Sequence, residues 1–329
     1  MSLVKPPGRQ RGSLFAAFGR LLVTILVLAF IGAFAWAIFT SNSIEREENV
    51  NPNLSLPGRI VTIPSFGDVH LREVGSGGIP VLFIHDFDIA GGYQWLPVAE
   101  SLGSRWMLIP DMIDFGFSAR PSDPGRIHTV VGRAEALFGL LEELEIARVS
   151  VVGAGYGGEV AAEMAALEPD RVVSLVLISP EIYGPERTWE SYLFGLPVLA
   201  DAMNFTFIGA GSRAENRYAA GCETGGWCPS PDALAVRDQT ARVPGTTEAL
   251  TAFAQSPEAS TLPDALSAIT APTLILWGDD DLLTPLEQGQ QLNAAIEGSE
   301  LTVVPGTGHR PHLEDPAAVA GFIAEFLES

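Results

Sequence analysis

The sequence predicts a mostly parallel α/β sheet that is covered by helices on both faces and follows one N-terminal membrane helix. Two observations carry this prediction. Short β-branched runs alternate with segments whose apolar residues recur at helical spacing, and this alternation is typical of chains that build parallel sheets. In addition, 19 consecutive residues near the amino terminus, 21–39, carry no charged side chain.

Eight short runs are predicted as strands. Several of the later ones are continuously apolar, as expected for strands that are buried on both faces. The first two meet around Phe66-Gly67-Asp68 and predict an antiparallel hairpin. We expect strands at 60–63, 69–74, 81–84, 107–109, 149–152, 172–178, 273–277 and 301–304, and helices at 130–144, 160–167, 286–295 and 317–327.

The uncharged run 21–39 is long enough to cross a membrane. As a helix it would span about 28 Å, close to the thickness of the hydrocarbon core of a bilayer. A cleaved secretory signal is the alternative, because Ala33-Phe34-Ala35 resembles a cleavage site, although the apolar region of such a signal usually covers only about 7–15 residues. Either interpretation exports the rest of the chain.

The charges on the two sides of the run predict its orientation. Four basic residues and no acidic residue precede it, whereas Glu45, Glu47 and Glu48 follow it with Arg46 as the nearby cation. By the positive-inside rule, the N-terminus is then cytoplasmic. We therefore expect a single-pass protein of the cell membrane with an extracytoplasmic C-terminal domain.

The composition excludes several classes of protein. The 329 residues are 47% hydrophobic, and 19 Lys+Arg stand against 40 Asp+Glu, for a net charge of −21. This is not the composition of a disordered tail, a collagen-like fibre or a disulfide-dense miniprotein. All the acidic residues follow Ser43. Nucleic acid is therefore not an expected partner, because a polyanion requires a basic surface.

Proline content and the strand pattern divide the chain. A basic leader (1–20) and the transmembrane helix (21–39) precede a polar, proline-containing linker (40–58). The alternation of strands and helices then covers 59–180 and 267–329. Between these parts, residues 181–266 contain seven prolines and interrupted helical patterns. We expect this segment to form a lid over the sheet.

Two cysteines, Cys222 and Cys228, are the only ones in the chain. An oxidising compartment permits a disulfide between them, and closing so short a loop contributes about 2–2.5 kcal/mol by chain entropy. Two free buried thiols are the alternative. No metal site is expected here, because two sulfur atoms without further His or Cys neighbours make a poor zinc site.

Three segments follow predicted strands and carry polar residues typical of an active site. They are VSVVGAGYGG (149–158), WGDDDLLTP (277–285) and GTGHRPH (306–312). Ligands of open α/β sheets bind at the carboxyl ends of the strands. An acidic residue followed late in the chain by a histidine is also the order of acid and base in one type of nucleophilic triad.

These segments resemble the α/β-hydrolase superfamily over nearly all of residues 59–329. The resemblance rests on IHDF (84–87), PDMIDFGFSARP (110–121), GAGYGG (153–158), LILWGDDDLLTP (274–285) and PGTGHRPHLEDP (305–316), with Asp114 where glycine is usual. It implies the α/β-hydrolase fold with an inserted helical lid. It also implies that His309 is the general base and that Asp281 orients it.

Two residues depart from the family pattern at the implied active site. The nucleophile position is occupied by Gly155, which has no side chain to attack a carbonyl. Where the family usually has His-Gly, this chain has His85-Asp86, and a carboxylate there would oppose a developing oxyanion. By resemblance, the backbone N–H groups of Phe87 and Tyr156 would form the oxyanion hole. Asp86 as a substitute nucleophile is a further alternative.

Two other interpretations of these residues remain open. Gly153, Gly155 and Gly158 match G-x-G-x-x-G between a strand and a helix, which is also a dinucleotide-binding pattern, with Glu181 as a possible ribose-binding acid. The acidic run 279–281 could be a solvated turn or a weak cation site.

We expect a membrane-anchored, catalytically impaired or non-catalytic hydrolase homologue without a cofactor. It would bind a small apolar molecule or a protein partner, and lid aromatics would supply apolar walls: Trp189, Tyr192, Phe194, Phe205 and Phe207. The alternative is an active hydrolase of esters or related small molecules in which His309 activates water directly. A third possibility is that Gly155 replaces a serine by design.

Overall fold

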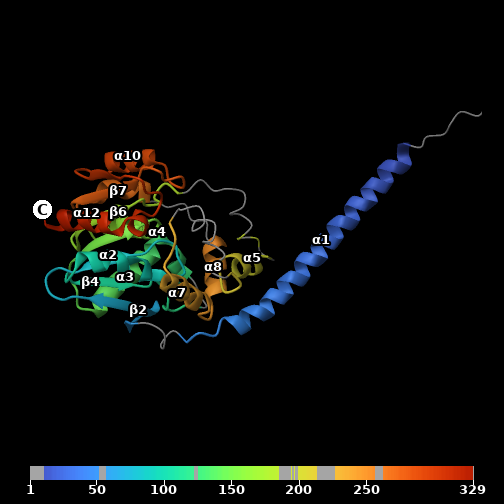
Figure 1. The fold of residues 1–329 in the computed structure, drawn as a ribbon, viewed down its shortest axis with the longest axis horizontal. Helices are drawn as coiled ribbons and strands as arrows, with labels where there is room; N and C mark the ends of the chain where they lie inside the picture. The colour runs from blue at the N-terminus through green and yellow to red at the C-terminus, as the bar shows by residue number, and fades with distance from the viewer. Residues whose placement is uncertain are drawn as a thin grey trace, which may run out of the picture.

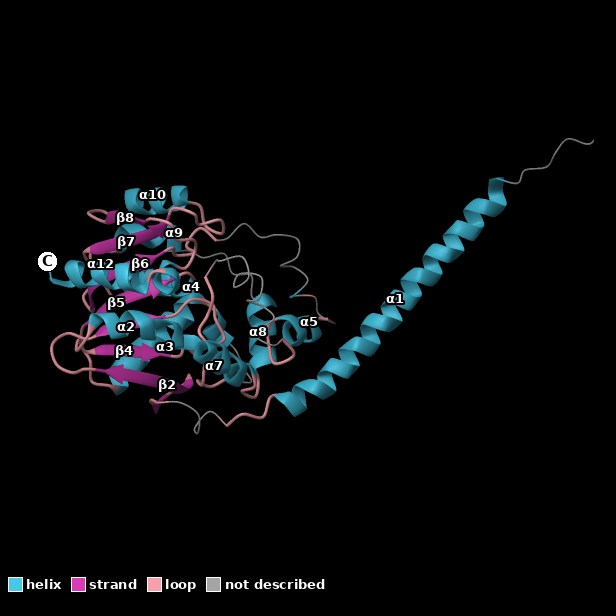
Figure 2. Ribbon diagram, viewed as in Figure 1, coloured by secondary structure: helices cyan, strands magenta, loops and turns pink. Residues whose placement is uncertain are grey.

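The computed structural model describes residues 11–51, 57–121, 125–184, 194, 196, 199–212, 227–255 and 262–328. These residues form one eight-stranded sheet with the order β1-β2-β4-β3-β5-β6-β7-β8. Helices cover both faces of the sheet, and the long helix α1 projects away from it (Figures 1 and 2). The predicted fold class is confirmed.

The strands pair as their apolar patterns predict. β1 (Arg59–Ile63) and β2 (Gly67–Val74) form the antiparallel hairpin, and β2 is also antiparallel to β4. All other pairs are parallel, and every residue of β3, β4, β5 and β7 is buried, which explains their continuously apolar sequences. The remaining bounds are β3 (Val81–Ile84), β4 (Met107–Pro110), β5 (Val149–Ala154), β6 (Val172–Ile178), β7 (Thr273–Gly278) and β8 (Glu300–Val304).

Two sets of helices bury the two faces of the sheet. On one face α2 (Leu96–Leu102) and α12 (Pro316–Glu328) pack on a core that contains Trp95 and Phe83. On the other face lie α3 (Val130–Glu143), α4 (Tyr156–Leu167) and α10 (Leu286–Ala295). Helix α4 begins four residues before the predicted helix 160–167, because glycines in its first turn interrupt the apolar pattern.

The described part of the segment between β6 and β7 consists mainly of helices. It contains α5 (Ala200–Phe207), α7 (Pro231–Ala241), α8 (Thr246–Gln255) and α9 (Leu262–Ala265). We call residues 181–266 the insertion, and its action as a lid stays a prediction. Of its predicted wall aromatics, Phe205 is buried and Phe194 packs edge-on against Phe207, whereas Trp189 and Tyr192 lie outside the described residues.

The N-terminal helix is longer than the predicted transmembrane run. Helix α1 covers Arg11–Glu47, and its stretch Leu21–Glu47 is apolar enough to cross a membrane. It therefore continues through the first part of the predicted linker 40–58, because residues 40–51 contain neither proline nor glycine. Its apolar side chains are exposed, unlike those of a core helix.

The structure describes one of the two cysteines of the predicted disulfide. Cys228 is disulfide-bonded, and its predicted partner, Cys222, lies outside the described residues.

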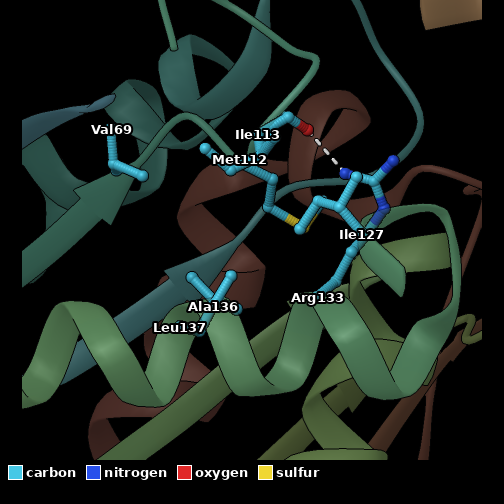
Figure 3. Close-up of a pocket in the computed structure, with 7 residues that line it drawn as sticks. All are labelled: Val69, Met112, Ile113, Ile127, Arg133, Ala136 and Leu137. Carbon is cyan, nitrogen blue, oxygen red and sulfur yellow. Dashed lines mark hydrogen bonds between the residues drawn. The ribbon is translucent and has the colours of Figure 1, made fainter. Parts of the chain in front are cut away.

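A small cavity beneath α3 is a packing feature and not a ligand site. It holds about 10 Å³, about enough for one water molecule. Figure 3 shows apolar side chains around it and Arg133, whose Nη1 donates to the carbonyl oxygen of Ile113 at 2.5 Å. Its lining residues are Val69, Met112, Ile113, Ile127, Arg133, Ala136 and Leu137.

Candidate active site

The predicted site residues meet at the carboxyl ends of five neighbouring strands. Asp86 follows β3, Gly155 follows β5, Glu181 follows β6, Asp281 follows β7 and His309 follows β8. Because these strands are parallel neighbours, residues that are up to 223 positions apart in the sequence share one edge of the sheet.

Gly155 lies in the sharp turn between β5 and α4. Its backbone is left-handed, with φ 52° and ψ −123°, a conformation that side-chain-bearing residues rarely adopt. The turn also needs a glycine at Gly157, because a Cβ atom there would collide with the carbonyl oxygens of Ile84 and His85. The local geometry is that of a nucleophile elbow without a nucleophile.

Asp86 fills the space in front of this turn. A Cβ atom built on Gly155 would lie 2.5 Å from Cγ of Asp86 and 3.2 Å from its Oδ2. Real Cβ atoms essentially never approach another heavy atom more closely than 3.0 Å. The carboxylate of Asp86 therefore stands where the first side-chain atoms of a residue at position 155 would be.

The two backbone N–H groups predicted for the oxyanion hole converge on this carboxylate. Phe87 N–H donates to Oδ1 of Asp86 at 2.7 Å, and Tyr156 N–H donates to the same oxygen at 3.1 Å. Nε of Arg310 lies 3.1 Å from Oδ2. The two N–H groups that the resemblance implies as oxyanion donors therefore bind the carboxylate of Asp86 in this structure.

His309 is oriented as the resemblance implies. Its Nδ1 lies 2.9 Å from Oδ2 of Asp281, which is buried and also accepts hydrogen bonds from the hydroxyl and backbone N–H of Thr284. Nε2 of His309 faces Oε1 of Glu181 at 3.4 Å, within ion-pair range but not aligned as a hydrogen bond.

Glu181 is the site residue whose role the sequence did not reveal. The G-x-G-x-x-G pattern would make it a ribose ligand, but it lies against His309. Gly155 and Gly158 belong to the elbow turn, where Gly158 N–H donates to the Gly155 carbonyl oxygen. The available signal was its place just after the sixth strand, at the same edge of the sheet as the other site residues.

The protonation states follow from this arrangement. Burial alone would raise the pKa of Asp86, but the charges of Arg310 and His309 outweigh it and hold the pKa below its ordinary value. Burial would lower the pKa of His309, but the hydrogen bond to Asp281, the nearby carboxylate of Glu181 and the charge of Asp86 raise it to about 10. Burial also raises the pKa of Glu181. At neutral pH the site therefore pairs a carboxylate at Asp86 with an imidazolium at His309.

Among the described residues, Asp86, Glu181 and His309 form a group whose donor atoms could bind a metal ion. Donor atoms of Asp86, Glu181 and His309 all lie within 4.8 Å of one another. Arg310 already neutralises Asp86, however, and a protonated His309 cannot coordinate a cation. In the acidic run 279–281, the exposed Asp279 accepts a hydrogen bond from the N–H of Gly306 at 2.6 Å. Such a contact is typical of a solvated turn.

One aromatic side chain of the insertion packs on the rings of the two residues that supply the N–H donors. Phe253 of α8 packs on Phe87 with ring centroids 4.6 Å apart and on Tyr156 at 5.2 Å. Arg133 lies beneath, and its Nε donates to the hydroxyl of Tyr156 at 3.0 Å. The insertion therefore contributes an aromatic side chain that contacts both residues whose N–H groups bind Asp86.

The other departure from the family pattern also has a structural reason. Asp114 has a φ of 75°, which explains why glycine is usual at this position. Its buried carboxylate lies 3.1 Å from Arg133 and 2.9 Å from His128. These two contacts hold an aspartate in a conformation that favours glycine.

Comparisons with known proteins agree with the fold. A model of the alpha/beta hydrolase family matches residues 81–322. The chain is 30% identical over 303 residues to 2-hydroxy-6-oxo-2,4-heptadienoate hydrolase of Pseudomonas putida, covering 85% of this chain and 98% of that protein. It is 26% identical over 273 residues to 2-hydroxymuconate semialdehyde hydrolase of a Pseudomonas species, covering 78% and 89%.

Solved structures give the same result for the fold. A meta-cleavage product hydrolase of Pseudomonas fluorescens superposes with a TM-score of 0.67 at 20% identity, over 82% of this chain and 97% of that chain. A bacterial membrane phospholipase A superposes with a TM-score of 0.63 at 23% identity, over 94% and 98%. The chain, with its eight-stranded sheet, elbow turn and His309–Asp281 pair, belongs to the alpha/beta hydrolase family.

Proposed function

We propose that the chain is a hydrolase of small molecules in which the carboxylate of Asp86 acts as the nucleophile that position 155 lacks. The observation that carries this proposal is the position of Asp86, whose carboxylate fills the space in front of Gly155 and receives the N–H groups of Phe87 and Tyr156. The named relatives are hydrolases, which supports the general reaction class.

The occupied N–H groups favour attack on a saturated carbon over attack on an ester. An ester carbonyl needs an oxyanion hole in its first step, and Oδ1 of Asp86 already holds both donors. Displacement at a saturated carbon places no oxyanion there. A strained cyclic ether, an epoxide, is the simplest substrate of this class, because its leaving oxygen needs a proton and His309 carries one.

In the first step, Oδ2 of Asp86 attacks a ring carbon of the epoxide. The carbon–oxygen bond of the ring breaks, its electron pair moves to the ring oxygen, and His309 donates its Nε2 proton to that oxygen. The product is an alkyl ester of Asp86 that carries a free hydroxyl. His309 is now neutral, and the negative charge on Asp86, which raised its pKa, has gone.

In the second step, neutral His309 takes a proton from water, and the water oxygen attacks the carboxyl carbon of Asp86. Oδ1 becomes an oxyanion between the N–H groups of Phe87 and Tyr156. Its collapse expels the alkoxide, which takes the proton from His309. The resulting carboxylic acid of Asp86 then passes its own proton to His309, so that the diol leaves and both groups return to their starting states.

A single-turnover reaction in ¹⁸O-labelled water tests this mechanism. With the protein in excess over styrene oxide, we expect one ¹⁸O atom in the peptide that contains Asp86 and none in the first diol molecule. Asp86→Asn should abolish turnover. Asp280→Asn, which changes an exposed carboxylate at the same edge of the sheet, should leave turnover within about twofold. Label in the diol and not in Asp86 would instead show direct attack by water activated by His309.

A non-catalytic binding role is the second candidate. It is favoured by Arg310, whose guanidinium lies against Oδ2, the oxygen that must attack. In that case Asp86 and Arg310 form a closed ion pair that fills the former catalytic space, and the site binds an apolar molecule or a protein partner beside Phe253. The absence of turnover of both styrene oxide and p-nitrophenyl acetate would support this candidate and contradict the first.

A further inference from the structure

The end of the anchor helix α1 is fixed to the insertion by polar contacts that the catalytic site does not use. Glu47, the last residue of α1, forms an ion pair with Arg242, which follows α7. Three residues further on, Val50 N–H donates to the carbonyl oxygen of Arg242 at 3.0 Å. The chain therefore does not leave the helix as a loose tether.

Glu48 is the most buried part of this attachment. It is only 7% exposed, and its carboxylate accepts the N–H groups of Gly245 and Thr247, each at 2.9 Å, and the hydroxyl of Thr247 at 2.5 Å. These donors form the N-terminus of α8, where a negative charge is favourable. We call the contacts of Glu47 and Glu48 with this region the anchor clasp.

The contact between α1 and the insertion lies directly after the apolar run 21–39. Thr40 follows the last residue of the run 21–39 and is already 3% exposed, and α1 packs along α5. The eight residues from Thr40 to Glu47 continue the helix and rise only about 12 Å. A membrane around residues 21–39 therefore has its surface close to α5 and α8, and Figure 2 shows α1 leaving the domain on this side.

Large apolar side chains are exposed in the insertion and in the loop after β7. Phe207 at the end of α5 is 52% exposed, and Leu282, next to the site residue Asp281, is 97% exposed. Such residues favour the interface between lipid headgroups and acyl chains. The strong negative charge of the exported part opposes binding to anionic lipid, so the observations favour a zwitterionic lipid surface.

We propose that the anchor clasp holds the insertion and the catalytic edge of the sheet against the membrane surface, so that the site receives apolar substrates from the lipid phase. The lipid surface contacts Phe207 and Leu282. This docking is independent of the chemistry proposed above, because it rests on the contacts of α1, α5 and α8 and not on Asp86.

Depth-dependent quenching in phosphatidylcholine nanodiscs tests the docking. A single thiol is introduced into the full-length protein by Phe207→Cys, by Leu282→Cys or, as control, by Ile79→Cys, which is 49% exposed in the loop before β3 at the amino end of that strand. Each thiol carries an environment-sensitive fluorophore. We expect brominated lipid to quench positions 207 and 282 at least threefold more strongly than position 79. Equal quenching at all three positions would overturn the proposal.

The clasp itself is tested in the same labelled proteins. Glu48→Ala removes the buried carboxylate and should reduce quenching at position 282 to the level of position 79, whereas Glu45→Ala changes an exposed glutamate one turn earlier and should leave it unchanged. A melting temperature measured alongside separates release of the clasp from global unfolding. Unchanged quenching in a folded Glu48→Ala protein would show that the clasp does not orient the domain.

Discussion

Gly155 has no side chain, and the carboxylate of Asp86 occupies the space that a side chain at this position would need. A Cβ atom at Gly155 would lie 2.5 Å from Cγ of Asp86, so a side chain at position 155 would have to displace the carboxylate of Asp86. The two departures from the family pattern, which look independent in the sequence, are therefore sterically coupled. This coupling determines what single substitutions at the site will do.

Restoring a serine should fail unless the aspartate is removed. Gly155→Ser alone is expected to lower the free energy of unfolding by about 1–3 kcal/mol, because overpacking displaces Asp86 from its donors, and to give no esterase activity. The double variant Asp86→Gly/Gly155→Ser should be more stable than Gly155→Ser. It should also hydrolyse p-nitrophenyl acetate, because the N–H groups of Phe87 and Tyr156 then become available to an oxyanion.

Urea unfolding and a p-nitrophenol assay check this prediction. The triple variant that also carries His309→Ala is the control, and it should lose the new activity. Esterase activity in Gly155→Ser alone, with Asp86 still present, would contradict the steric coupling.

The raised pKa of His309 predicts a characteristic loss of stability at alkaline pH. The ordinary pKa is 6.5 and that of the folded protein is about 10, so the native state binds this proton more tightly than the unfolded chain. The stabilisation is fully present below pH 6.5 and is lost as the pH rises through about 10. Urea unfolding at pH 6, 8 and 10.5 should show this decline, and His309→Gln should show a smaller one.

The same raised pKa predicts the pH profile of the proposed first step. Because protonated His309 supplies the proton to the leaving oxygen, the single-turnover rate with styrene oxide should stay level through neutral pH and fall only near pH 10. An unperturbed histidine would give a fall near pH 6.5. Stopped-flow measurement of ester formation in His309→Gln should show a slower reaction with no such fall.

Asp114 should be essential for stability and not for chemistry. Asp114→Ala removes the carboxylate that faces the buried Arg133 and His128 and is expected to cost about 3–5 kcal/mol of unfolding free energy. Asp114→Gly should cost about 1 kcal/mol less, because glycine accepts the φ of 75° without strain. Glu300→Ala, an exposed change on β8, is the matched control and should stay within about 0.5 kcal/mol. Equal losses in the alanine and glycine variants would exclude a contribution from backbone strain.

The sequence was sufficient for the fold because its signals are local. Continuously apolar runs such as 149–152 predict buried strands, and the spacing of Gly153 and Gly157 predicts a tight turn. The order of Asp281 and His309 predicted their pairing, which the structure places at 2.9 Å. The end of helix α1 was not predictable in this way, because the polar residues after Phe39 are typical both of a linker and of a solvated helix end.

By itself, the sequence determined an α/β hydrolase domain behind an apolar helix, with a histidine–acid pair and no side chain at Gly155. Only the tertiary structure decided what takes that space. The carboxylate of Asp86 reaches it from another strand, and Glu181 reaches His309 from a third. The physical reason is that parallel strands bring distant residues to one edge of the sheet, where contact and charge depend on directions in space that sequence spacing does not record.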